Sequence, residues 1–272
     1  MKKILCLHGY RTNTDLMKFQ CALIEENLRG QAEFDYLEAP FVSDAPYDAI
    51  VGMLAEPPYY QWSERGKPTM QGLFTGVQHI EDYVRKHGPF SAILGFSQGG
   101  AMAILVAALQ RRQLEGLPEL RIRWAQAVVL VCPAKPFTTL KNVDDFLRLP
   151  VEDCPVILVS GRNDYDCYRF SETIYNMFSP SERRGHFVHD KGHQFPDALS
   201  VELNSQIAQA IKSVLDGLPA SLAKNGDIIG SQMYAVGPEP PPVKTAKPLE
   251  HTQKKPEPDL ISIFCRWFGY TP

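Results

Sequence analysis

Short apolar runs bounded by turn residues recur along the first 215 residues of the chain. Runs of this length and composition are typical of strands that are covered on both faces of a sheet. They predict strands over Lys3–Leu7, Phe34–Leu37, Phe90–Leu94, Ala127–Val131, Val156–Val159 and Gly185–His189.

Between these runs, apolar residues recur with the spacing of amphipathic helices. This spacing predicts helices over Asp15–Leu28, Gln71–His87, Gly99–Arg112, Val143–Leu147, Phe170–Met177 and Asp197–Leu215. Asp197 is the expected N-cap of the last helix, and Gly217 is its expected stop. Because strands and helices alternate, they form βαβ units with parallel strands. The sequence therefore predicts an α/β fold with a mostly parallel central sheet flanked by helices on both faces.

Residues 41–70 follow neither the strand period nor the helix period. The segment carries several prolines beside the aromatic residues Tyr59, Tyr60 and Trp62. A connection of this length is unusual between a strand and a helix, and such loops commonly serve as lids or binding loops. We therefore expect 41–70 to be a lid or substrate loop.

The chain changes character after residue 217. Pro238–Pro258 holds seven prolines in 21 residues, which predicts an extended Pro-rich linker over 218–259. Residues 260–272 end the chain as a short aromatic, amphipathic tail, which we expect to dock on its own domain or on a partner. The predicted organisation is one α/β domain over 1–217, followed by this linker and tail.

Composition and charge exclude several classes of protein. The 272 residues carry 28 basic and 31 acidic side chains, for a net charge of −3, so no cationic excess favours nucleic acid. The six cysteines form no CxxC pair and no cluster with zinc-ligand spacing, which predicts reduced thiols in a cytoplasmic protein without a metal. No uncharged apolar stretch reaches about 18 residues, so we expect no transmembrane segment.

The pentapeptide Gly95–Gly99 has the pattern G-x-S-x-G. It directly follows the apolar run Ala92–Leu94 and directly precedes a helical run, which is the strand, sharp turn and helix of a nucleophile elbow. In such a turn Ser97 is lifted clear of the sheet, and the Gln98 amide lies at a helix N-terminus where it can stabilise an oxyanion. The pattern predicts a nucleophilic serine with an oxyanion donor beside it.

A serine nucleophile needs a base that is oriented by an acid. In the chain order of α/β-hydrolases, Ser is followed by Asp or Glu and then by His. Asp164 lies in the loop after the predicted strand Val156–Val159, with Asp166 as the alternative, and His193 lies in the loop before the last helix. His186 and His189 fall on a predicted strand, where packed or surface histidines are expected.

A second oxyanion donor is expected near the end of the first predicted strand. His8 and Gly9 form the His-Gly loop that supplies such a donor in related folds, and the Tyr10 backbone N–H is our candidate. Tyr59, Tyr60 and Trp62 are candidates for the walls of an apolar acyl pocket, although aromatic residues of this kind also pack loops onto a core.

Four segments carry a resemblance to the FSH-type serine hydrolases, a family of small α/β-hydrolases. They are Leu5–Tyr10, Asp35–Pro40, Gly95–Gly100 and Gly192–Pro196, and the Gly95–Gly100 string is shared with acyl-protein thioesterases and carboxylesterases. The resemblance covers about the first 215 residues, and it implies an α/β-hydrolase fold with Ser97, Asp164 and His193 as a triad.

The activity implied by the residues and the resemblance is hydrolysis of a small-molecule acyl ester or thioester through an acyl-enzyme, without a cofactor. An alternative from another class is a catalytically inert hydrolase-fold protein that binds partners through its Pro-rich C-terminal region.

Overall fold

A computed structural model describes residues 1–63, 70–111, 126–135, 151–178 and 181–220 of the chain. The chain divides after Ile228, and the second unit, from Ile229 to Pro272, lies outside these residues. The predicted helix over 143–147, most of the Pro-rich linker and the aromatic tail also lie outside them.

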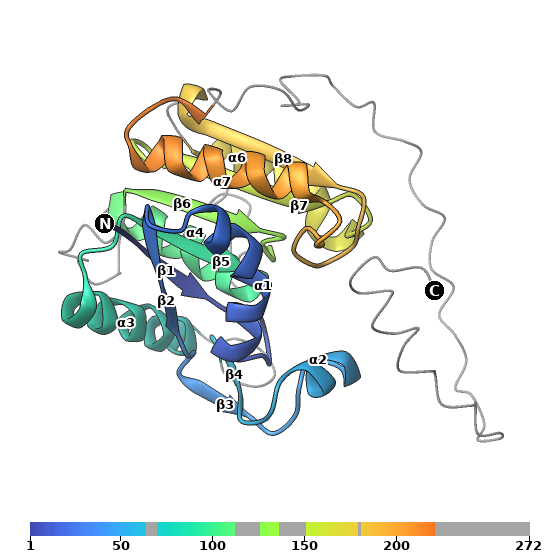
Figure 1. Ribbon diagram of the computed structural model, residues 1–272. Helices are drawn as coiled ribbons and strands as arrows, with labels where there is room; N and C mark the ends of the chain where they lie inside the picture. The colour runs from blue at the N-terminus through green and yellow to red at the C-terminus, as the bar shows by residue number, and fades with distance from the viewer. Residues whose placement is uncertain (64–69, 112–125, 136–150, 179–180, 221–272) are drawn as a thin grey trace. The chain divides into compact units, whose positions relative to one another are not determined.

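A sheet of six strands forms the centre of the first unit, in the order β2-β1-β5-β6-β7-β8 (Figure 1). All neighbouring strands of this sheet are parallel. Their bounds are β1 Lys2–Leu7, β2 Ala32–Leu37, β5 Ala92–Phe96, β6 Ala127–Val131, β7 Val156–Gly161 and β8 Arg184–His189. The predicted α/β fold with a mostly parallel sheet is confirmed.

Helices cover both faces of the sheet. Their bounds are α1 Thr14–Asn27, α3 Met70–His87, α4 Gln98–Arg111, α6 Tyr165–Met177 and α7 Val201–Leu215, with the 3₁₀ turn η1 at Ser181–Arg183. Because side chains alternate along a strand, Ile4 and Cys6 of β1 pack with α1 and α7, whereas Leu5 and Leu7 pack with α3, α4 and α6. This two-sided burial explains why the strands are almost continuously apolar. None of the described helices has the length and apolar character needed to cross a membrane.

Several predicted boundaries differ from the structure, and the largest difference is at α6, which begins at Tyr165 rather than at Phe170. Strand β5 begins at Ala92 rather than at Phe90, because the Phe90 ring is buried by packing beside Tyr83 instead of by strand pairing. Helix α7 begins at Val201, and Asp197 is not its N-cap. The Asp197 carboxylate instead accepts hydrogen bonds from the backbone N–H and the hydroxyl of Ser200, which makes a separate turn before the helix.

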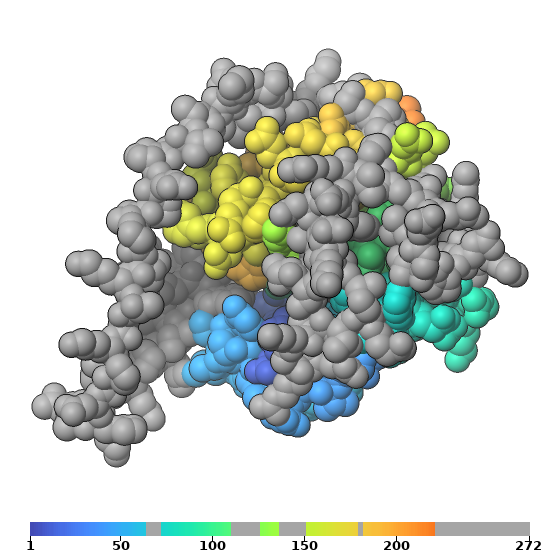
Figure 2. Space-filling view, turned by 180° about the vertical axis from the view of Figure 1, so that it is seen from behind, coloured from blue at the N-terminus to red at the C-terminus, as the bar shows by residue number. Residues whose placement is uncertain are grey.

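The segment 41–70 contains regular structure that the sequence periods did not predict. Strands β3 (Phe41–Ser43) and β4 (Tyr59–Gln61) pair antiparallel, and α2 (Ala49–Leu54) lies between them. Strands of three residues are too short to show a period of two, which is why the pattern missed them. The light-blue atoms of this segment reach the face shown in Figure 2, below the yellow atoms of the region around α6. Its role as a lid or substrate loop stays a prediction.

The end of α7 follows the predicted glycine stop. Gly217 has φ +78°, and the added Cβ of another residue there would meet nothing within 4 Å. The Gly217 N–H donates to Val214 O, and the Leu218 N–H donates to Ser213 O, which is a Schellman ending. The glycine is therefore required for its backbone conformation and not for space.

We expect Gly217→Ala to lower the free energy of unfolding by about 1 kcal/mol, because a Cβ disfavours the left-handed conformation. Gly217→Asn should cost less, since asparagine tolerates this conformation. Urea unfolding of the two variants and the unaltered protein checks the expectation. Equal urea midpoints for all three would show that this turn does not limit stability.

Candidate active site

Ser97 occupies the sharp turn between β5 and α4. Its φ of +52° is strained for a residue with a side chain, which is the conformation expected of a nucleophile elbow. Two residues further on, a Cβ on Gly99 would lie 2.1 Å from Leu7 O and 2.6 Å from His8 O. Glycine at this position lets the first turn of α4 lie against the end of β1.

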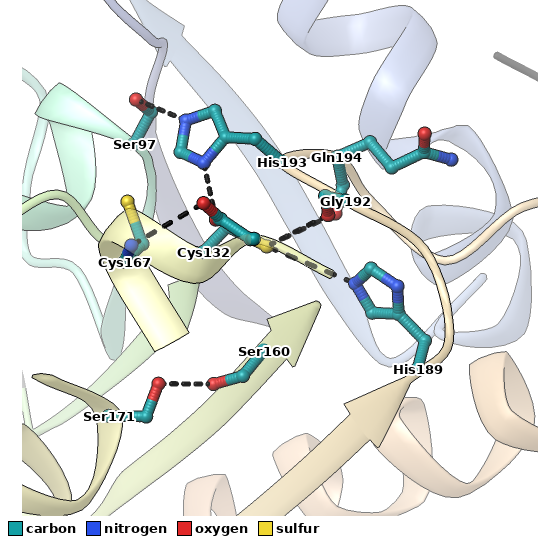
Figure 3. A network of polar contacts seen from close by, with 10 residues as sticks. Ser97, Cys132, Ser160, Cys167, Ser171, His189, Gly192, His193 and Gln194 are labelled. Carbon is teal, nitrogen blue, oxygen red and sulfur yellow. Dashed lines mark hydrogen bonds and ion pairs between the residues drawn. The ribbon is translucent and has the colours of Figure 1, made fainter. Parts of the chain in front are cut away.

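The structure brings the Ser97, His193 and Asp164 side chains together at the carboxyl ends of the strands. Figure 3 shows the Ser97 and His193 side chains of this group pointing toward one another. His193 Nε2 lies 2.7 Å from Ser97 Oγ, and His193 Nδ1 lies 2.6 Å from Asp164 Oδ2. Asp164 follows β7 and caps α6, while His193 lies in the loop between β8 and α7. These contacts have the order of a nucleophile, a base and an orienting acid.

The two candidate acids have different surroundings. The Asp164 carboxylate is 7% exposed and bonded to His193, whereas Asp166 lies exposed on the first turn of α6. Burial opposes ionisation of Asp164, but its hydrogen bonds from His193 and from the Cys167 N–H outweigh this effect and lower its pKa. The structure therefore favours Asp164 over Asp166 as the partner of His193.

Cys132 is a neighbour of the site that sequence analysis missed. It follows β6 with φ +41°, and its buried thiol donates to Gln194 O at 3.3 Å, in the same loop as His193. Burial, and then the charge of Asp164, raise the pKa of the thiol to about 12. The position of a cysteine directly after an apolar strand, at the edge that carries the elbow, was the signal that could have found it.

Cys132, Asp164 and His193 offer ligand atoms within 4.8 Å of one another, and within the described ranges this is the one such group that could hold a metal ion. The His193–Asp164 hydrogen bond of 2.6 Å already joins two of these groups, and a metal would have to replace its proton. The thiol stays protonated at neutral pH. These groups fit a hydrogen-bonded Ser-His-Asp site better than a metal site.

The two candidate oxyanion donors lie at the start of α4 and in the loop between β1 and α1. Gln98 is the first residue of α4, where N–H groups have no partner inside the helix. Tyr10 lies between β1 and α1, next to Arg11, which has φ +52°. Among the residues that the structure describes, neither the Gln98 backbone N–H nor the Tyr10 backbone N–H has a protein acceptor. With respect to these residues, both N–H groups could donate to an oxyanion.

The aromatic residues expected to wall an acyl pocket are largely packed into the protein. Trp62 is fully buried in the core with α3 and α4, and its indole N–H donates to His8 O at 2.9 Å. Tyr59 is 5% exposed, and its hydroxyl donates to Ala55 O. This packing leaves Trp62 and Tyr59 little surface for a substrate, and the assignment of Tyr59, Tyr60 and Trp62 to a substrate wall stays a prediction. Tyr60 is half-buried and remains a candidate.

The histidines of β8 and one cavity differ in their place relative to the site: His189 Nε2 lies 3.9 Å from Cys132 Sγ, whereas the cavity lies at the other end of the strands. His186 and His189 are largely buried, and burial lowers the pKa of both, to about 4 for His186. A cavity of about 480 Å³ lies near the amino ends of β1 and β2, opposite to the triad. Its lining includes Lys2, Gln31 and Lys212, and none of the candidate site residues.

We expect acid to destabilise the protein partly through Asp164. Its pKa in the folded chain lies below the ordinary value of 3.8, so the unfolded chain takes up the proton first as the pH falls. The stabilisation is complete above pH 3.8 and is lost as the pH falls through the lower folded value. Asp164→Asn should flatten the fall in the free energy of unfolding across this range.

Urea unfolding at a series of pH values between about 6 and 2.5 measures this slope. Asp166→Asn is the matched control, because this carboxylate is exposed on the same turn. A slope that Asp164→Asn leaves unchanged would contradict the expected stabilisation.

The chain is similar in sequence to proteins named as hydrolases and esterases. The chain is 27% identical over 227 residues to the protein named Hydrolase phiM of a fungal species, covering 81% of this chain and 97% of that protein. It is 26% identical to Esterase OVCA2 of Danio rerio, over 73% of this chain and 92% of that protein. It is 30% identical to Esterase CG5412 of Drosophila melanogaster, over 71% of this chain and 68% of that protein.

Solved structures share the fold at low sequence identity. A carboxylesterase from Mesorhizobium loti aligns with a TM-score of 0.53 and 10% identity, covering 79% of this chain and 88% of that one. Acyl-protein thioesterase 2 from Zea mays aligns with a TM-score of 0.52 and 14% identity, covering 79% and 94%. Both confirm the α/β-hydrolase fold. The family profile described as Serine hydrolase (FSH1) matches residues 1–203, and the chain belongs to this family of serine hydrolases.

Proposed function

We propose that this serine hydrolase cleaves carboxylic esters or thioesters through an acyl-enzyme, with Ser97 as nucleophile, His193 as base and Asp164 as the orienting acid. The single observation that carries the proposal is the continuous hydrogen-bonded chain from Ser97 Oγ through the His193 ring to the Asp164 carboxylate. The strained backbone of Ser97 at the elbow supports the same role.

In the first half-reaction, Ser97 Oγ bonds to the acyl carbon while its proton moves to His193 Nε2. The tetrahedral intermediate collapses when the bond to the alkoxide or thiolate leaving group breaks, and that group takes the proton from Nε2. Asp164 holds the Nδ1–H of His193 and stabilises the imidazolium that forms. In the second half-reaction a water repeats these steps, which releases the carboxylic acid and restores the Ser97 hydroxyl.

Negative charge develops on the acyl oxygen in both tetrahedral intermediates. The proposed donors to this oxygen are the backbone N–H of Gln98, at the positive end of α4, and the backbone N–H of Tyr10. A single donor of this kind contributes on the order of 10²–10³ in rate. No metal or cofactor is part of the proposed mechanism.

We propose a class of substrates and not a single compound. Esterase is the printed name of the Danio rerio and Drosophila melanogaster relatives, and a thioesterase from Zea mays shares the fold. Small acyl esters and acyl thioesters are therefore the substrates to compare first. Tyr60, which is half-buried on β4, stays a candidate for the substrate wall.

The inert interaction protein is the less supported alternative. A protein without catalysis has no need for the strained Ser97 or for the Ser97–His193–Asp164 contacts. Docking of the C-terminal tail and a cytoplasmic location stay predictions, and the tail lies outside the described residues.

We expect Ser97→Ala to lower kcat/KM on p-nitrophenyl acetate by at least about 10³, because the acyl-enzyme can no longer form. The same variant should lose labelling by a fluorophosphonate probe. Initial rates and in-gel labelling of the purified full-length chain check both points.

Ser205→Ala is the matched control, because Ser205 is exposed on α7 and should leave both signals unchanged. Absence of hydrolysis and labelling in the unaltered protein would favour the inert alternative. Hydrolysis that survives in Ser97→Ala would contradict the assigned nucleophile.

A further inference from the structure

His8 is fully buried at the end of β1, and both of its ring nitrogens have partners. The Ala39 backbone N–H donates to His8 Nε2 at 3.0 Å. Because a backbone amide can only donate, Nε2 must carry a lone pair and not a proton. Burial lowers the pKa of the ring to about 4, so the ring is neutral near pH 7. Its one proton therefore lies on Nδ1.

The Nδ1–H of His8 faces the carbonyl oxygen of Gly9 at 2.8 Å and the Thr12 hydroxyl oxygen at 3.0 Å. The Thr12 hydroxyl in turn donates to the same Gly9 carbonyl at 2.9 Å. Two side-chain donors thus hold one carbonyl group in one direction.

The Gly9 carbonyl belongs to the same peptide group as the Tyr10 N–H. In a planar trans peptide these two bonds point in opposite directions, so fixing the carbonyl also fixes the amide. Resting on the function proposed above, we infer that His8, as its Nδ1–H tautomer, is a positioning residue that aims the Tyr10 N–H at the oxyanion. His8 makes no contact with substrate in this role and acts only through the Gly9–Tyr10 peptide.

The backbone of His8 connects this peptide to the other proposed donor. The Trp62 indole N–H donates to His8 O at 2.9 Å, and the Trp62 backbone N–H donates to Gln98 Oε1, also at 2.9 Å. Gln98 Nε2 donates to Ser63 Oγ at 3.1 Å. Trp62 thereby links Gln98, whose backbone N–H is one proposed oxyanion donor, to His8, which orients the other proposed donor, the Tyr10 N–H. This network accounts for a tryptophan being buried next to the elbow.

The neighbouring backbone makes such positioning necessary. Gly9 has no side chain to restrain the backbone on the amino side of the Gly9–Tyr10 peptide. This peptide can rotate about the Gly9 backbone unless its carbonyl is bound. If it rotated, the Tyr10 N–H would point away from the site, with the loss of rate expected for one oxyanion donor.

A series of substitutions at His8 tests the inference. Asparagine places an amide donor near the position of Nδ1, whereas leucine offers no donor. We expect His8→Leu to lower kcat on p-nitrophenyl acetate by about 10², with KM changed less than about threefold. The kcat of His8→Asn should be at least about tenfold higher than that of His8→Leu. His87→Asn, at an exposed helix residue, is the control that should leave the kinetics unchanged.

Thr12 gives a second, milder pair. Thr12→Val removes one donor to Gly9 O with little change of shape, and we expect about a tenfold loss of kcat that Thr12→Ser restores. A trifluoromethyl ketone, which forms an oxyanion with Ser97, should bind more weakly in proportion to kcat/KM across all these variants. A role limited to folding would instead change the melting temperature without this proportionality.

The tautomer is measured directly on the unaltered protein. Nitrogen-15 NMR of the histidine rings, with His8 assigned by its absence in His8→Asn, should show a neutral Nδ1–H ring from pH 5 to 8. An Nε2–H ring, a charged ring, or folded His8→Leu with unchanged kcat would each overturn the inference. In each of these outcomes the unaltered enzyme is active. If the proposed function itself is wrong, the unaltered enzyme neither hydrolyses esters nor reacts with the fluorophosphonate, so the two failures can be distinguished.

Discussion

The site depends on the close approach of the first turn of α4 to the last carbonyl groups of β1. Only a residue without a Cβ fits at Gly99, because a Cβ there would clash with the carbonyl oxygens of Leu7 and His8. This approach places Ser97 and the Gln98 amide beside the loop of His8–Tyr10. The proposed nucleophile and both proposed oxyanion donors are therefore arranged by backbone packing, before any substrate is present.

The parallel sheet supplies the rest of the arrangement. Because all six strands run in one direction, the loops after β1, β5, β6, β7 and β8 meet at one edge. Ser97 and His193 are 96 residues apart in the chain, yet their side chains lie within hydrogen-bond distance. The buried apolar strands hold these loops at fixed spacing, so the conformational cost of bringing the three side chains together is met by folding of the domain.

Much of this arrangement could be predicted from the sequence, because strand alternation and the G-x-S-x-G turn have local signatures. The choice between Asp164 and Asp166 could not be settled from the sequence, since it depends on which carboxylate lies at the start of α6 and contacts His193. Trp62 was assigned to a substrate wall because a buried aromatic and a pocket aromatic have the same local pattern. Sequence analysis missed Cys132 because its contacts with the site are made with residues that are distant in the chain.

The histidines show how burial separates catalytic from structural use of one residue type. His186 Nε2 lies 3.1 Å from the hydroxyl of Ser160, which resembles the His193–Ser97 pair in distance. Ser160 is 1% exposed, however, and its hydroxyl is also bonded to Ser171 at 2.8 Å.

A substrate cannot reach the buried Ser160 hydroxyl, and desolvation lowers the pKa of His186 to about 4, which makes its ring a poor proton acceptor. The His193 side chain is 31% exposed and has a carboxylate at Nδ1 to stabilise the charge that it gains. The described residues thus include two Ser–His contacts, and the exposure of the serine and the third partner of the histidine distinguish the pair that is proposed to support hydrolysis.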